Sequence, residues 1–142
     1  MKNILILFIV FASILSCSSK RNQLKGNWYS CTPEGEYLEL FTKKDSFRIV
    51  TDRSIVTNWT HYRIESDTIF FKTPLDWNES SKAILNYNSG KSLTMKFINI
   101  NETTKLKPLN SIVENIEDEY ELLISCKKRA KKAECNVGNK NN

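Results

Sequence analysis

The sequence has few residues of the kinds on which enzymes and metal sites are built. Its 142 residues include a single histidine, His61, four glycines and three prolines. It contains no Gly-x-Ser-x-Gly turn, no glycine-rich phosphate loop and no Cys-x-x-Cys pair. One histidine and scattered acidic residues do not make the ligand set of a zinc site. We therefore expect no catalytic residue, no bound metal and no cofactor.

Length and charge exclude two further classes of protein. A chain of 142 residues is too short for several domains, and its formal net charge is a modest +5. Basic residues cluster only near the C-terminus, without the interleaved aromatic residues of a nucleic-acid-binding surface. We expect one small domain and no nucleic-acid partner.

The clearest pattern lies at the N-terminus. Lys2 and Asn3 precede an apolar run over residues 4–15, and small residues follow that run. This order is typical of a signal peptide. Twelve residues are too few to cross a hydrocarbon core about 30 Å thick, which requires about 20 residues of helix. We therefore interpret residues 1–16 as a signal peptide and not as a membrane-spanning segment.

The segment Ile14-Leu15-Ser16-Cys17 resembles the lipobox of bacterial lipoproteins. The resemblance implies cleavage before Cys17, attachment of a diacylglycerol to its sulfur, and acylation of its new amino group with a chain such as palmitate. At about 0.8 kcal/mol per buried methylene, two or three acyl chains anchor a small domain on a lipid bilayer. In that family, serine after the cysteine accompanies sorting to the outer membrane, and Ser18 fits. The resemblance thus predicts an envelope lipoprotein on the periplasmic side of the outer membrane.

Ordinary secretion is the alternative, and it would leave Cys17 as a structural cysteine. We favour lipidation because the cysteine lies directly at the end of the apolar run. Residues 17–23 then form a lipidated tether, residues 24–136 the folded domain and residues 137–142 a disordered tail.

Three cysteines remain if Cys17 is acylated, an odd number for an oxidising compartment. Cys126 and Cys135 lie on the helix predicted below, where nine residues separate their Cα atoms by about 13.5 Å. A disulfide requires a Cα distance below about 7 Å. We therefore expect Cys31 to pair with one of these two cysteines, and favour Cys135 at the helix end, with Cys126 as the alternative.

From Asn27 onward, apolar and polar residues alternate between turn signals, as in half-buried strands. The pattern predicts a mainly β fold, an antiparallel meander or barrel of seven or eight strands. The predicted strands are residues 28–31, 37–41, 47–50, 59–64, 68–72, 83–87 and 93–98, with an eighth at 104–106 that Pro108 ends at a sheet edge. Residues 74–80 are predicted to form a loop.

One C-terminal helix is predicted after the strands, starting at a capping box of Ser111 and Glu114. Acidic residues crowd its first half and basic residues its second, which complements the helix dipole. We interpret the basic end as a solvated helix end, with adhesion to anionic lipid as the alternative. The residues predicted to share one face are Ile112, Val113, Ile116, Tyr120, Leu123, Lys127, Ala130 and Glu134.

The opening of the meander, Leu24-x-Gly26-x-Trp28, resembles the start of lipocalin-like barrels. In that family the tryptophan closes the barrel floor and stacks on a basic side chain of a late strand. The resemblance implies that Lys105 or Lys107 is this partner here, and the final helix matches lipocalin order. The alternative is a glycine at a sheet edge beside a core tryptophan.

The predicted anchor and barrel suggest two alternative functions. The first is a membrane-anchored binding protein that holds a small apolar ligand in its barrel. The second is an interaction module without a cavity, such as an envelope accessory subunit or an enzyme inhibitor, which has an envelope protein as its partner. An enclosed apolar pocket of about 300 Å³ or more inside the barrel favours the first function. A filled barrel with an exposed aromatic patch favours the second.

Overall fold

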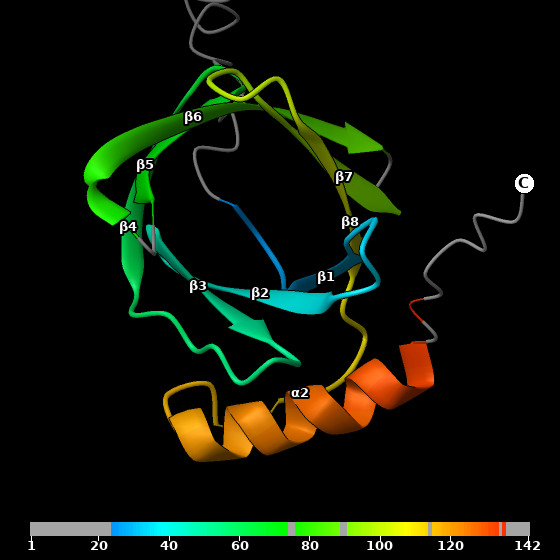
Figure 1. Ribbon diagram of the computed structural model, residues 1–142. Helices are drawn as coiled ribbons and strands as arrows, with labels where there is room; N and C mark the ends of the chain where they lie inside the picture. Colours follow the sequence, from blue (N-terminus) through cyan, green and yellow to red (C-terminus); the bar gives the residue numbers. More distant parts are fainter. Residues whose placement is uncertain (1–23, 74–75, 89–90, 114, 134, 136–142) are drawn as a thin grey trace, which may run out of the picture.

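The computed structural model describes residues 24–73, 76–88, 91–113, 115–133 and 135. Eight antiparallel strands form a closed barrel in chain order, and one helix, α2 (Glu119–Ala133), lies against its outside (Figure 1). The strands are β1 (Trp28–Cys31), β2 (Tyr37–Lys43), β3 (Ser46–Thr51), β4 (Thr60–Glu65), β5 (Thr68–Thr73), β6 (Asp76–Asn88), β7 (Ser92–Phe97) and β8 (Thr103–Pro108). The predicted mainly β barrel with one C-terminal helix is confirmed. The predicted signal peptide, the tether with Cys17 and the tail (residues 1–16, 17–23 and 137–142) lie outside the described residues.

The barrel closes between its first and last strands. Trp28 pairs with Pro108 and Tyr29 pairs with Lys107. The sequence led us to expect Pro108 at a sheet edge. This expectation is wrong, because Pro108 pairs with Trp28 in the closed barrel. It is tolerated in the ladder because it is the last residue of β8, where a missing N–H costs little.

Strand β6 is longer than predicted. Residues 74–80 were expected to form a loop, but β6 starts at Asp76 and pairs with β5 through Lys72 and Ser80. The pairing shifts register between Lys72 and Thr73. Residues 76–81 lack the alternation of apolar and polar residues that predicts a strand. The first part of β6 is therefore defined by its pairing with β5 and not by its sequence pattern.

The inside of the barrel is lined by every second residue of its strands. In β4, Thr60 and Tyr62 are buried while His61 and Arg63 are exposed, as the alternation predicts. A continuous apolar cluster results, which we name the barrel cluster. It consists of Leu24, Trp28, Leu40, Phe47, Tyr62, Ile69, Ala83, Leu85, Leu93, Met95 and Leu106.

A second cluster lies between the barrel and α2, on the outer faces of β2 and β3. Strand β2 is buried on both faces, because its even-numbered residues face the lumen and its odd-numbered residues face the helix. We name this second set the interface cluster. It consists of Tyr37, Phe41, Val50, Leu122 and Cys126.

The helix begins later than predicted. Asp118 caps α2, since its Oδ1 accepts hydrogen bonds of 3.0 Å from the second and third backbone N–H groups that follow it. Ser111 lies outside the helix, and Glu114 lies outside the described residues. The predicted helix start at a Ser111 and Glu114 capping box is therefore wrong, because Asp118 supplies the cap.

The buried face of α2 also differs from the prediction. Leu122 and Cys126 are fully buried against the barrel, whereas Tyr120 is 74% exposed and Lys127 is exposed. The predicted face included Ile112, which does not belong to the helix. Four other residues of the predicted face, Val113, Ile116, Leu123 and Ala130, do pack against the interface cluster. The prediction is wrong at Ile112, Tyr120 and Lys127, and it missed Leu122 and Cys126.

Candidate functional site

One end of the barrel is closed by the residues that the Gly-x-Trp motif places there. Gly26 has a φ of +91°, a conformation that glycine adopts readily and other residues rarely do. The turn leads Trp28 into the lumen, where its ring is buried and meets the ring of Tyr87 edge-on at 6.3 Å. Trp28 is thus a buried member of the barrel cluster at the end where β1 begins, and the floor role that the resemblance implies for it stays a prediction.

A buried hydroxyl fastens the chain at this floor. The Oη of Tyr62 accepts a hydrogen bond of 2.9 Å from the N–H of Leu24 and donates one of 2.8 Å to the carbonyl oxygen of Lys44. Burial raises the pKa of Tyr62, so the phenol remains a donor at neutral pH. Leu24, Trp28 and Tyr62 together seal this end of the lumen.

The basic partner expected for Trp28 is not present. Lys105 and Lys107 are exposed on the outer face of β8, whereas the intervening Leu106 faces the lumen. The lysine stacking predicted for Trp28 is therefore wrong, because strand alternation points the two side chains away from the tryptophan. Tyr87 occupies one side of the indole instead.

The opposite end of the barrel contains a recess of about 650 Å³ between the β1–β2 turn and the β7–β8 turn. Ser30, Leu38 and Thr104 line its inner part, and Leu38 packs against the barrel cluster. Charged residues of the two turns, among them Glu34 and Glu102, line its outer part. The recess therefore passes from a charged rim to an inner part where Leu38 lies between two hydroxyl side chains, and we refer to it as the mouth recess.

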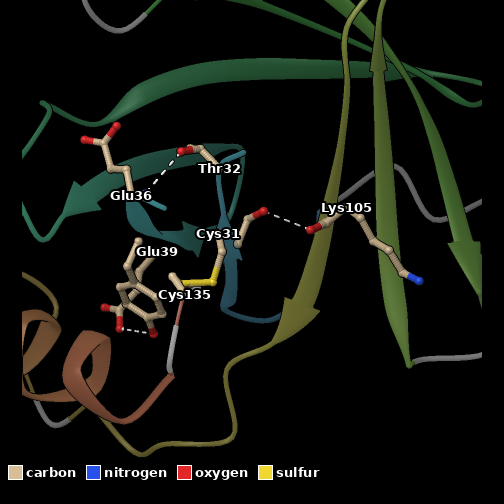
Figure 2. Close-up of a disulfide and its surroundings, with 8 residues drawn as sticks. Cys31, Thr32, Glu36, Glu39, Lys105 and Cys135 are labelled. Carbon is tan, nitrogen blue, oxygen red and sulfur yellow. Dashed lines mark hydrogen bonds between the residues drawn. A yellow bond between two sulfur atoms is a disulfide. The ribbon is translucent and has the colours of Figure 1, made fainter. Parts of the chain in front are cut away.

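Hydrogen bonds and a disulfide order one side of this rim (Figure 2). Ser30 Oγ donates to the carbonyl oxygen of Lys105 at 2.9 Å, which ties β1 to β8. Thr32 Oγ1 accepts from the N–H of Glu36 at 3.2 Å within the β1–β2 turn. These contacts fix the wall of the recess on this side.

The disulfide joins Cys31, at the end of β1, to Cys135, beyond the end of α2, with their Cα atoms 5.4 Å apart. The expected pairing is confirmed (Figure 2). Cys31 also lines the mouth recess, so the bond links the recess wall to the helix.

Cys126, the alternative partner, is a free and fully buried thiol. Burial, and then the carboxylate of Glu39, raises the pKa of Cys126 to about 12. The thiolate is the nucleophilic form of cysteine, and at neutral pH this side chain stays protonated. Cys126 is a packing residue of the interface cluster.

A buried ion pair between barrel and helix was not predicted. Glu39 is 0% exposed, and its two carboxylate oxygens accept hydrogen bonds from Arg129 Nε at 2.6 Å and Nη2 at 2.8 Å. Tyr37 Oη donates a third bond of 2.8 Å to Oε1 (Figure 2). Burial, and then the Glu39 carboxylate, raises the pKa of Tyr37 above its ordinary value. This carboxylate is fully partnered and enclosed, so it connects helix to barrel and is not placed to meet a substrate.

A second buried cation, Arg48, holds the start of the helix. Its side chain is 3% exposed, donates to the carbonyl oxygens of Thr57 and Ile116 at 3.2 Å each, and pairs with Glu119 at 2.9 Å. The guanidinium carbon lies 5.0 Å from the ring centroid of Trp59, a cation–π distance. The sequence does not indicate that Arg48 holds the helix, because an arginine that alternates with apolar residues in a strand is expected to face solvent.

A serine, a histidine and an aspartate meet at the start of β3, but not as a catalytic triad. The Nδ1 atom of His61 lies 3.0 Å from Ser46 Oγ and 3.6 Å from Asp45 Oδ1. A triad requires the two partners on opposite ring nitrogens, so that one can orient the base for the other. Here both approach the same nitrogen, and the histidine ring is exposed.

Neither a metal-binding cluster nor a membrane-spanning helix occurs among the residues that the structure describes. Within those residues, no three histidine, cysteine or acidic side chains are grouped closely enough to hold a metal ion. Within the same residues, no helix has both the length and the apolarity needed to cross a bilayer.

Comparison of the chain with protein-family models, with curated protein sequences and with solved structures finds no match.

Proposed function

We propose that the chain is a membrane-anchored bacterial envelope lipoprotein that binds, without catalysis, a small ligand with an apolar body in its barrel. The observation that carries the proposal is the mouth recess of about 650 Å³. Sites for small ligands are typically concave volumes of about 300 to 1,000 Å³, lined by apolar groups with a few polar groups that fix orientation. A closed floor and a hollowed opposite end are what such a site requires.

The lining of the recess suggests how the ligand is oriented. Its apolar part would lie against Leu38, and its polar end would remain at the rim near Glu34, Glu102 and Lys105. Both signs of charge are present at this rim. A ligand with hydrogen-bonding groups at one end therefore fits better than a purely hydrocarbon one.

The ligand is tested in two steps. The protein should be purified under conditions that do not strip a bound ligand. Mass spectrometry should then detect a co-purifying small molecule. An apolar dye whose emission rises on leaving water should bind the protein, and Leu38→Trp should abolish that emission by filling the recess. The matched control is Ile84→Trp on the exposed face of β6, which should leave dye binding unchanged. Equal dye binding by both variants contradicts the proposed site.

The anchor is tested separately. The lipobox resemblance at Cys17 supports lipidation, and Cys17→Ser should release the domain into the soluble envelope fraction. Retention of this variant in the membrane fraction would refute the lipid anchor, whatever the outcome for the ligand.

The alternative function is an interaction module that binds an envelope protein. The observation that favours it is the filling of the lumen by the barrel cluster, whose members are almost fully buried. An absence of co-purifying ligand, together with dye binding that Leu38→Trp does not alter, would favour this alternative.

A further inference from the structure

The outer face of α2 combines exposed apolar and basic side chains. With Leu122 and Cys126 marking the buried side, a rotation of 100° per residue places five residues in an arc about 100° wide on the opposite side. Tyr120 is 74% exposed and Ile124 is 37% exposed, and the three lysines are exposed. We name these five residues the outer helix face: Tyr120, Ile124, Lys127, Lys128 and Lys131.

The positive charge of this face is not neutralised by the rest of the described structure. Acidic residues at the start of the helix face barrel cations, since Glu119 pairs with Arg48 and Glu117 pairs with Lys43. In the described parts of the chain, no ion pair involves any of the three lysines of the outer helix face. Exposed Glu121 lies beside Lys128 at the edge of this arc, so the outer helix face is predominantly basic.

A hollow of about 450 Å³ adjoins the apolar end of this face, between α2 and the segment before it. Ile112, which is 92% exposed, lines it with Val113, Tyr120 and Ile124, and Lys128 and Glu121 lie at its border. Apolar side chains beside lysines are the combination by which amphipathic helices insert at the boundary between acyl chains and anionic headgroups.

Helix α2 starts at the same end of the barrel as Leu24, the first residue that the structure describes. The N–H of Leu24 donates to Tyr62, whose hydroxyl donates to the carbonyl oxygen of Lys44. The preceding residue, Lys43, pairs with Glu117 two residues before α2. If Cys17 is the anchor, the seven residues 17–23 span at most about 25 Å, so the bilayer surface lies within reach of the helix.

We propose that the outer helix face docks on the anionic phospholipid surface of the membrane that carries the anchor. This inference rests on the proposed membrane anchoring and is independent of the proposed ligand. Tyr120, Ile124 and Ile112 insert among the headgroups, and the three lysines contact lipid phosphates. Figure 1 shows α2 on one side of the barrel, so docking places the helix between barrel and membrane.

The experiment uses the full chain, purified with its membrane attachment and reconstituted into vesicles of phosphatidylcholine with or without phosphatidylglycerol. A fluorophore on Ile112→Cys reports contact with a nitroxide-labelled lipid through quenching. The same fluorophore on Ile100→Cys, an exposed isoleucine of the β7–β8 turn, is the matched control. The unsubstituted chain carried through the labelling reaction gives the blank. We expect phosphatidylglycerol to increase quenching at residue 112 and not at residue 100.

Charge neutralisation tests the recognition itself. Lys127→Gln, Lys128→Gln and Lys131→Gln together should lower the ratio of docked to undocked protein about a hundredfold, since each basic residue near an anionic surface contributes about fivefold. The control carries Lys82→Gln, Lys91→Gln and Lys96→Gln, three exposed lysines of β6 and β7 or the turn between them. This control has the same net charge and should dock like the parent chain.

Three results would overturn the docking proposal. The first is quenching at residue 112 that does not respond to phosphatidylglycerol. The second is an equal effect of the two triple substitutions. The third is a signal that depends on protein concentration and not on lipid charge, which would assign the face to a second copy of the chain.

Flotation separates this proposal from the anchor. A chain that fails to float with phosphatidylcholine vesicles contradicts the proposed anchoring, whereas the response to phosphatidylglycerol still reports on the outer helix face.

Discussion

The inside of the barrel and the interface between barrel and helix are both well buried, but different interactions hold them. The barrel cluster is made almost entirely of apolar side chains, one from every second strand position. The interface buries apolar residues too, and adds Arg48, the Glu39–Arg129 ion pair and the Cys31–Cys135 disulfide close by. Its stability therefore depends on groups whose partners lie far away in the sequence.

This difference sets how each region responds to change. A shortened apolar residue in the barrel leaves a cavity, and its neighbours can relax around it. Removing one partner of a buried ion pair leaves a charge without compensation, which relaxation does not repair. The interface should therefore be more sensitive to single polar substitutions, and the predictions below concern its links in order of decreasing effect.

The largest effect is expected from the disulfide. It closes a loop of 104 residues, and the chain-entropy account assigns about 4.7 kcal/mol to a loop of that size. Cys31→Ala with Cys135→Ala should lower the free energy of unfolding by about that amount, measured by urea unfolding.

The matched control for the disulfide is Cys126→Ala, which leaves the bond in place. It should cost less, because only a small buried side chain is shortened. Equal midpoints for the parent chain and the double variant would show that the bond adds nothing to stability.

The next largest effect is expected from Arg129→Ala. This change leaves the fully buried Glu39 carboxylate without its cationic partner, while Tyr37 still donates to it. Breaking a buried pair from one side typically costs about 3 kcal/mol or more. Urea unfolding measures the loss, and the helix signal in circular dichroism shows whether α2 detaches.

The comparison for Arg129 is Arg63→Ala, which removes a cation from the exposed pair with Glu65. Surface pairs of this kind contribute about 0 to 1 kcal/mol. If the two arginine substitutions cost the same, the Glu39–Arg129 pair does not hold the helix.

A smaller effect is expected from Asp118→Ala, which removes the N-cap of α2. Loss of such a cap typically costs about 1 kcal/mol. Ser111→Ala tests the capping position that the sequence pattern indicated, and it should leave the free energy of unfolding unchanged. A larger loss from Ser111→Ala than from Asp118→Ala would contradict the helix start described above.

The smallest effect concerns the exposed Glu117. Hydrogen bonds from Lys43, and then from Trp59, hold the pKa of Glu117 below its ordinary value. A lowered pKa stabilises the fold above the ordinary pKa of the carboxyl, and this contribution disappears as the pH falls through the lowered value. Lys43→Met should raise the pKa of Glu117 in an NMR titration, whereas Lys44→Met should not change it.

Most strands were predictable because their determinant is local. Trp28 to Cys31 is a strand with the expected bounds, and the inward and outward residues of β4 follow the alternation. The first part of β6 was not predictable, since its pairing with β5 depends on hydrogen bonds between segments and not on an apolar pattern. The helix start was predicted too early, because the pattern was counted from residues before Asp118, which lie outside the helix, although Leu123 and Ala130 of the predicted face do pack against the interface cluster.

The candidate site divides in the same way. Gly26 and Trp28 were found from their motif, because the motif is local: a glycine with a positive φ is followed two residues later by a large aromatic side chain. The mouth recess was not found, since Ser30, Leu38 and Thr104 come from three separate strands. No signal in any one of these strands marks a recess.

The alternation of apolar residues was sufficient to define which face of each strand lies inside, because burial of a strand face follows from local order alone. The signal-peptide pattern at the N-terminus is likewise local in the sequence, and it stays a prediction. Tertiary structure alone decided that Glu39 and Arg48 are buried and that Arg129 is half-buried beside Glu39, because a charged side chain is stable away from water only when a partner is in place. Arg129 lies 90 residues beyond Glu39 in the chain, and only barrel closure and helix packing bring the two together.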